Sequence, residues 1–210
     1  MNELSSFADG IRAALDAKNA ARDSALVTSR EAIRFCANSI RAIHREEFEE
    51  AAKLLHEART RVQETKEALK DYPDIYFAGY VQDAQKEYTE AETMHAFIRD
   101  LPIPSPEELG VEAAPYLNGV GEGVSECRRS VLDIMRRGNI ARAEELLKKM
   151  DDAYYVLIAF DYPDAITGGL RRTMDQTRPV LERTRGDITV TIRQNELEHA
   201  LNRAVEAFRG

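Results

Sequence analysis

Residues 77–99 of this 210-residue chain read FAGYVQDAQKEYTEAETMHAFIR, and this stretch decides the fold. Its apolar residues recur every three or four positions, which predicts an amphipathic helix. We expect the helix to run from about Ile75 to Arg99 and to turn one heptad stripe toward the interior. The stripe comprises Phe77, Tyr80, Ala84, Glu87, Ala91, Met94 and Ile98.

Glu87 is the one charged residue on this otherwise apolar stripe. Burying an ionised carboxylate without a partner costs several kcal/mol, so such a group is usually protonated, paired with a cation or bound to a metal. Glu90 follows three residues later, and on a helix this spacing places the two side chains one turn apart on neighbouring positions. The pair can therefore converge on one ion.

The composition favours an all-α protein. Glycine (11) and proline (7) are sparse, tryptophan is absent, and the helix formers Ala, Glu, Arg and Leu dominate. No apolar run approaches the ~18 residues that a membrane span needs, and the first ten residues lack the pattern of a secretory signal. We therefore expect a cytoplasmic protein with no membrane partner.

Helical patterns cover most of the chain. We expect six or seven substantial helices in a single domain, residues 1–210, packed as an antiparallel bundle with short loops. Residues 188–192 have strand propensity, but no second strand exists to pair with them, so a helix is expected there too. Ser105, Pro106 and Glu108 form a capping-box pattern ahead of a short helical turn. Helical patterns run over about residues 2–19, 22–45, 48–69, 75–99, 114–137, 140–160, 166–185 and 187–208.

A basic stripe lies beside the apolar stripe of segment 22–45. We call its arginines the basic ridge: Arg30, Arg34, Arg41 and Arg45. One interpretation is that the ridge binds nucleic-acid phosphates. The other is a solvated face that pairs with nearby acids such as Glu31, Glu46 and Glu49.

A second pair of acids, Glu122 and Glu126, lies on segment 114–137 at a spacing of four, again on one helix face. The same segment contains Gly119, Gly121 and Gly123, which weaken a helix. Three glycines in this position indicate that a neighbouring backbone or a ligand comes close. From the spacing alone, a solvated pair is favoured over a site, because helices commonly carry acids at this spacing on exposed faces.

A different carboxylate chemistry is also open. Residues 92–95 and 196–199 both match Glu-x-x-His, the spacing with which ferritin-like bundles present di-iron ligands from two helices. However, Glu92, Glu196 and His199 all fall outside the apolar stripes of their segments, whereas a di-iron site needs its ligands to point into the core. Such a match arises easily by accident in a glutamate-rich chain.

Several of these motifs together resemble a known family. Residues 86–91, KEYTEA, resemble the glutamate motif of translin-associated factor X, the nuclease branch of the translin family. Residues 116–126, YLNGVGEGVSE, are similar to the family's Tyr-Leu-x-Gly-Val helix, with Glu122 where an aspartate is usual. Gly138-Asn139 stands where the family usually has Gly-Asp, and the segment from Arg30 to His44 is similar as well. The resemblance covers nearly the whole chain.

The resemblance implies a metal-dependent endoribonuclease that acts on single-stranded RNA. It also implies a homo-octamer, a closed shell of eight subunits with the acids on its inner surface. The alternative is a translin-like protein that binds single-stranded RNA or DNA without cleaving it. The resemblance does not tell whether a second, translin-like subunit is required.

Hard-cation chemistry narrows the cofactor. A set of four carboxylates with no nearby cysteine prefers Mg²⁺ or Mn²⁺ to Zn²⁺. We expect Glu87, Glu90 and Glu126 to be metal ligands, and Glu122 to be either a ligand or the base that positions water. Arg30, Arg34, Arg41 and Arg45 would then grip the backbone of the RNA strand.

Overall fold

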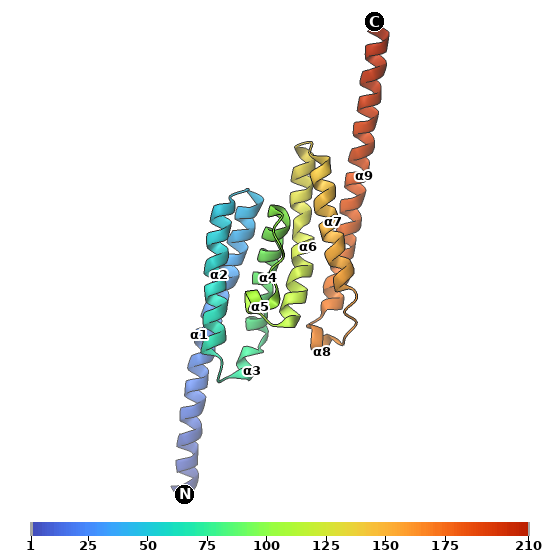
Figure 1. Ribbon diagram of the computed structural model, residues 1–210. Helices are drawn as coiled ribbons and strands as arrows, with labels where there is room; N and C mark the ends of the chain where they lie inside the picture. The colour runs from blue at the N-terminus through green and yellow to red at the C-terminus, as the bar shows by residue number, and fades with distance from the viewer. Residues whose placement is uncertain (1, 210) are drawn as a thin grey trace.

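The computed structural model describes residues 2–209, and α-helix is the only regular secondary structure within that range (Figure 1). The expected all-α fold is confirmed, and the described residues form six long helices where six or seven were expected. No helix between residues 2 and 209 combines the length and the apolar character that a membrane crossing requires. The long helices are α1 (Asn2–His44), α2 (Phe48–Ala68), α4 (Gly79–Arg99), α6 (Ala113–Arg136), α7 (Ile140–Leu157) and α9 (Leu170–Arg209). Single turns form α3 (Pro73–Tyr76), α5 (Pro106–Leu109) and α8 (Asp164–Thr167).

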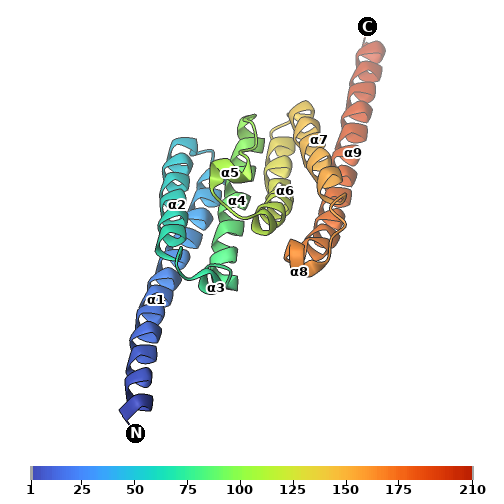
Figure 2. The same ribbon diagram turned by 60° about the horizontal axis from the view of Figure 1, so that its bottom comes forward.

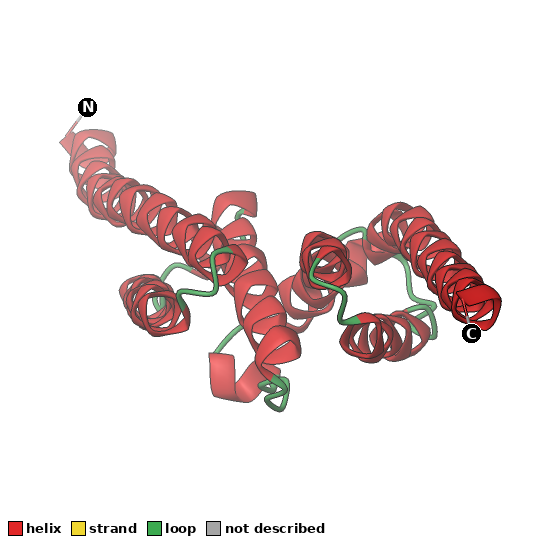
Figure 3. Ribbon diagram, turned by 90° about the horizontal axis from the view of Figure 1, so that it is seen from above, coloured by secondary structure: helices red, strands yellow, loops and turns green. Residues whose placement is uncertain are grey.

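The long helices form two groups of three. Helices α1, α2 and α4 pack together, as do α6, α7 and α9, and the two groups meet where α4 packs on α6. Seen from above, the two groups lie side by side (Figure 3), and α4 of one group and α6 of the other form the contact that joins them. The largest apolar cluster crosses this boundary, because it includes Met94 and Phe97 of α4 together with Val124 and Cys127 of α6.

Glycines bring α4 and α6 into close contact. A Cβ atom on Gly119 would lie 2.5 Å from the backbone oxygen of Lys86, and one on Gly123 would lie 2.9 Å from the backbone oxygen of Glu90. The expectation that a neighbouring backbone approaches this glycine-rich segment is therefore confirmed. The third glycine faces α9, since a Cβ on Gly121 would lie 2.4 Å from a side-chain carbon of Met174.

The segment at 77–99 is helical, but its start and its buried face differ from the prediction. A single turn, α3, precedes it, and α4 begins only at Gly79, so Phe77 lies outside the helix and is 61% exposed. Ala84, Ala91 and Met94 are buried as expected. Val81, Tyr88 and Phe97 are buried too, because α4 is covered by α1 and α2 on one side and by α6 on the other.

Two expected breaks are absent. Residues 2–19 and 22–45 belong to one helix, α1, because nothing between them interrupts helical hydrogen bonding. Segments 166–185 and 187–208 were also wrongly divided, since α9 continues through Gly186, at the modest cost of one helical glycine. Both long helices extend beyond the bundle at opposite ends of the molecule (Figures 1 and 2).

The free ends of α1 and α9 carry exposed apolar stripes. Their large apolar side chains recur at helical spacing and are mostly more than half exposed to solvent. The residues are Leu4, Phe7, Ile11 and Leu15 on α1, and Leu197, Leu201, Val205 and Phe208 on α9.

The expected capping box is present. The Ser105 hydroxyl accepts a hydrogen bond from the backbone N–H of Glu108, and the Glu108 carboxylate accepts one from the N–H of Ser105. Asn139 caps α7 by accepting a hydrogen bond from the N–H of Arg142. Both caps satisfy helix-end N–H groups that would otherwise lack partners.

We predict that Gly119→Ala destabilises the protein by about 1–3 kcal/mol, because the new methyl group would force α6 away from the backbone of α4. Urea denaturation measures the change in unfolding free energy.

Gly186→Ala is the matched control, because nothing lies within 4 Å of a Cβ at that position of α9. This substitution should stabilise the protein by about 0.5–1 kcal/mol, the usual effect of replacing a helical glycine. Equal effects of the two substitutions would contradict a close contact between α4 and α6.

Candidate metal centre

Three carboxylates meet at the contact between α4 and α6. Glu87 and Glu90 of α4 and Glu122 of α6 each present an oxygen, and these oxygens all lie within 4.8 Å of one another. We call these residues the acid cluster. The helical spacing of Glu87 and Glu90 and the glycine-mediated approach of α6 place the three side chains together.

Burial and the charges of neighbouring acids raise the pKa values of Glu87 and Glu90. Glu90 is the most affected, because burial and the charges of Glu87, Glu122 and Glu126 raise its pKa to about 8. The pKa of Glu87 is also raised, first by burial and opposed by the charge of Lys86. Glu90 therefore retains its proton at neutral pH when no cation is present.

Glu126 lies beside the acid cluster and is held by a histidine. His44, at the end of α1, places its Nε2 atom 2.7 Å from Oε1 of Glu126, and the His44 side chain is only 4% exposed. The hydrogen bond from His44 lowers the pKa of Glu126, against the opposing effect of burial. Glu126 is thus oriented from outside its own helix.

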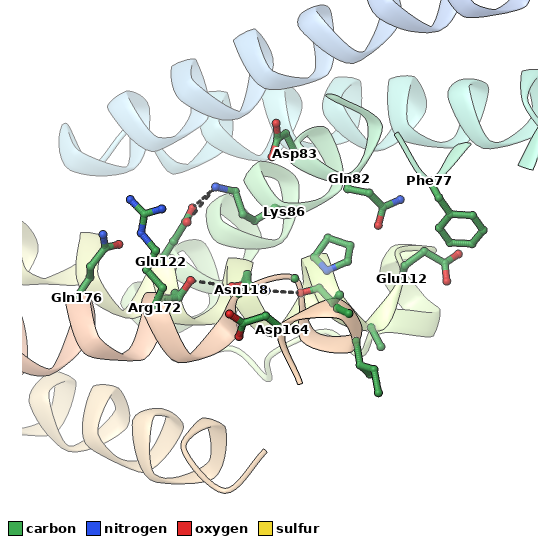
Figure 4. A pocket seen from close by; sticks show the side chains of 18 residues that line it. Phe77, Gln82, Asp83, Lys86, Glu112, Asn118, Glu122, Asp164, Arg172 and Gln176 are labelled. Carbon is green, nitrogen blue, oxygen red and sulfur yellow. Dashed lines mark hydrogen bonds and ion pairs between the residues drawn. The ribbon is translucent and has the colours of Figure 1, made fainter. Parts of the chain in front are cut away.

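Lys86 provides a positive charge at the acid cluster. Its Nζ atom lies 2.9 Å from Oε1 and 2.8 Å from Oε2 of Glu122, and 3.9 Å from Oε1 of Glu87. Figure 4 shows Lys86 reaching Glu122 from α4, with Arg172 of α9 extending toward the same carboxylate.

Two cavities open onto the acids. A cavity of about 320 Å³ is lined by Glu90, Glu122 and Glu126 together with residues of α9. A larger one of about 980 Å³ is lined by Lys86, Glu122 and Arg172 (Figure 4). The carboxylates are therefore accessible to an ion and to a larger molecule.

The basic ridge is exposed along α1. All four of its arginines are solvent-exposed, with Arg41 bonded to Asn38 and Arg45 paired with Glu47. Two of the acids expected to neutralise the ridge pair elsewhere, Glu31 with Arg61 and Glu46 with Arg137.

One end of the ridge lies beside the residue that holds Glu126. Arg41 precedes His44 by three residues, so their side chains are neighbours on the helix, and His44 contacts Glu126.

The residues of the di-iron alternative do not form a site. Glu92 and His95 are half-buried in α4, whereas Glu196 and His199 are exposed on the part of α9 that extends beyond the bundle. Long-range packing partners of α9 are α6, α7 and α8. The two Glu-x-x-His motifs are therefore not brought together to form one site.

Sequence reasoning missed the roles of His44 and Lys86. His44 lies on the apolar stripe of segment 22–45, a position typical of a core histidine, and its partner Glu126 lies 82 residues away in the chain. Lys86 does carry a signal, since it directly precedes Glu87 and stands four residues before Glu90. A lone cation inside an acidic motif indicates an internal counter-charge.

The donor set fits a small, hard divalent cation. Mg²⁺ binds oxygen ligands at about 2.1 Å, so neighbouring ligand oxygens lie about 3–4 Å apart. The acid cluster needs only small side-chain movements to reach that spacing. Its all-oxygen composition disfavours the softer metals that cysteine and histidine select.

Comparison with known proteins gives relatives over most of the chain. The chain is 35% identical over 188 residues to the uncharacterized protein MJ0175 of Methanocaldococcus jannaschii, and the match covers 89% of this chain and 83% of that protein. No protein-family model matches.

Solved structures share the fold. The structure of AfC3PO superposes with a TM-score of 0.82 at 32% identity, covering 87% of this chain and 95% of that one. AfC3PO in complex with duplex RNA gives a TM-score of 0.80 at the same identity and coverage. Apo-NeC3PO, at 24% identity, has a TM-score of 0.79 and covers 87% of this chain and 96% of that one, which supports the fold alone.

The raised pKa of Glu90 makes the metal-free protein sensitive to pH. Because the folded-state pKa, about 8, exceeds the ordinary value of 4.5, the folded state binds the extra proton between these values. The stability that this proton gives is complete below pH 4.5 and is lost as pH rises through 8. We predict that Glu90→Gln raises the melting temperature in EDTA at pH 9 by ~2–4 °C, with a much smaller effect at pH 5.

Glu198→Gln, on the exposed end of α9, is the control and should change neither melting temperature. An equal effect of Glu90→Gln at the two pH values would contradict the electrostatic origin of the stabilisation.

Proposed function

Because the chain belongs to the translin family, we propose that it is a metal-dependent endoribonuclease that acts on single-stranded RNA. The observation that carries this proposal is the meeting of Glu87, Glu90 and Glu122 within 4.8 Å, from two helices, at the wall of open cavities. The likeness to AfC3PO, which has been solved with duplex RNA, supports RNA as the ligand class.

The acid cluster would hold Mg²⁺ or Mn²⁺. When bound, the ion supplies an activated water and offsets the negative charge that develops on the phosphoryl oxygens. In this proposal Glu87, Glu90 and Glu122 are the ligands, and Glu90 loses its proton when the cation takes its place. Of the two roles that the sequence leaves open for Glu122, ligand or base, this proposal takes that of a ligand, and it moves Glu126 from the ligands to the positioning of water.

Glu126 is then the residue that positions the attacking water. Its hydrogen bond to His44 fixes one carboxylate oxygen, Oε1, and Glu126 also lines the smaller cavity together with Glu90 and Glu122. The water oxygen bonds to phosphorus, one P–O ester bond breaks, and Glu126 accepts the proton of the water. The departing ribose oxygen takes a proton from solvent.

The basic ridge would hold the RNA backbone. Its arginines are exposed, and the ridge leads along α1 toward His44 and the acids. Phosphate contacts of this kind position a strand without reading its bases, so we expect little sequence preference.

We expect the working form to be a homo-octamer. The exposed apolar stripes on the free ends of α1 and α9 support self-association, because such stripes rarely remain in water. Light scattering coupled to size-exclusion chromatography should give a mass of about eight times 23.7 kDa. A monomer at micromolar concentration would contradict this assembly.

The double variant Glu90→Gln/Glu126→Gln should abolish Mg²⁺-dependent cleavage of labelled single-stranded RNA and leave RNA affinity unchanged.

The double variant Arg34→Ala/Arg41→Ala should have the complementary effect. It should weaken RNA binding by ~10-fold or more and reduce the salt dependence of binding. Cleavage is followed by gel electrophoresis with Mg²⁺ or EDTA, and affinity by fluorescence anisotropy in EDTA.

Arg203→Ala, on the exposed part of α9, serves as the control for the ridge. Undiminished cleavage by the glutamine double variant would refute the assignment of the site. RNA binding by the wild type without turnover in Mg²⁺ or Mn²⁺ would favour the non-catalytic alternative, a translin-like protein that binds single-stranded RNA or DNA. A duplex RNA of the same sequence, tested in parallel, decides whether single strands are the preferred substrate.

A further inference from the structure

Lys86 occupies both oxygens of one carboxylate of the acid cluster. Its Nζ atom lies within 2.9 Å of each oxygen of Glu122 and also faces Glu87 at 3.9 Å. The Lys86 side chain is 25% exposed and that of Glu122 33%, so the pair is partly shielded from water. A shielded ion pair is screened less by salt than one on the open surface.

The ammonium of Lys86 offsets repulsion that the acids would otherwise impose on the fold. Burial lowers the pKa of Lys86, but the hydrogen bond and charge of Glu122 more than compensate, so its pKa is raised and the group stays charged. The same positive charge lowers the pKa values of Glu87 and Glu90 against the effect of burial.

We propose that Lys86 is a built-in counter-cation, which holds Glu122 in the metal-free protein and competes with a divalent cation for it. This inference rests on the proposed function for the metal site alone and not for RNA cleavage. A cation that binds Glu122 must take at least one of the two oxygens that Lys86 contacts, so the ammonium and the divalent cation repel each other across that carboxylate.

Displacement of Lys86 is physically accessible. Its side chain lines the open cavity of about 980 Å³, and a lysine has four flexible methylene groups with which to move into that space. The competition therefore requires rotation of one side chain and no rearrangement of the helices.

The test is a titration of the full-length protein with Mn²⁺ alone, followed by electron paramagnetic resonance, for the wild type and Lys86→Met. Removal of the competing ammonium should lower the Kd for Mn²⁺ by about five-fold. It should also lower the melting temperature in EDTA, and this deficit should disappear at saturating Mn²⁺, because the bound cation then supplies the missing positive charge.

Lys148→Met is the matched control. Lys148 also pairs with a carboxylate, that of Asp152 at 2.6 Å, but this pair lies on an exposed face of α7, outside the acid cluster. It should leave the Kd for Mn²⁺ unchanged. If Lys86→Met does not fold, Lys86→Gln removes the charge while retaining hydrogen-bond donors, and the same tightening is expected.

Three results would overturn the inference. If the Kd for Mn²⁺ is unchanged and the lowered melting temperature persists at saturating Mn²⁺, the ion pair of Lys86 with Glu122 has a purely structural role. Weaker Mn²⁺ binding by the variant would mean that Lys86 orients Glu122 for the metal. An absence of Mn²⁺ binding by the wild type would remove the competition altogether.

The inference can survive failure of the proposed function. If the wild type binds Mn²⁺ but does not cleave RNA, the nuclease function is refuted. Tighter binding of Mn²⁺ by Lys86→Met would still support the role of Lys86.

Discussion

The close contact of α4 with α6 is the constraint on which the rest of the structure depends. Gly119 and Gly123 let the two backbones approach so closely that any side chain there would meet a carbonyl oxygen of α4. The contact joins the two groups of three helices, and the main apolar cluster spans it. It also brings Glu87 and Glu90 close to Glu122. The packing that stabilises the fold therefore places three carboxylates together.

The protein balances that charge in three different ways. Glu90, the most buried of the acids, remains protonated near neutral pH. Glu122 is neutralised by Lys86, and Glu126 bonds to His44 from the end of α1. Each arrangement leaves carboxylate oxygens near the two cavities and is compatible with the metal-free fold. The remaining repulsion lowers the stability of that fold, and a bound cation would offset it. Such a balance is common where function requires like charges to lie together.

The sequence predicts much of this fold because the local signals agree. Helical periodicity, the capping box at Ser105 and the glycines of α6 each lead to the observed structure. The position of Glu87 on an apolar stripe predicts a buried acid that needs a partner. Its side chain is 30% exposed, and the helical spacing brings Glu90 beside it. By contrast, the association of these residues with Glu122 joins segments 32 or more residues apart, and only the family resemblance anticipates it. The contact of His44 with Glu126 spans 82 residues and leaves no local pattern.

The sequence does not predict that α1 and α9 are each continuous. The ends of both helices are exposed and amphipathic, so their apolar residues do not indicate where a helix stops.

We propose that the carboxylates at the contact of α4 and α6 form a site for a hard divalent cation. The most direct measurement is the anomalous scattering of Mn²⁺ in crystals of the protein grown with that ion. We predict a strong anomalous peak coordinated by Glu87, Glu90 and Glu122, with Lys86 displaced from Glu122. If crystals at saturating Mn²⁺ show no anomalous peak at this position, and Lys86 still contacts both oxygens of Glu122, the proposed metal site is wrong.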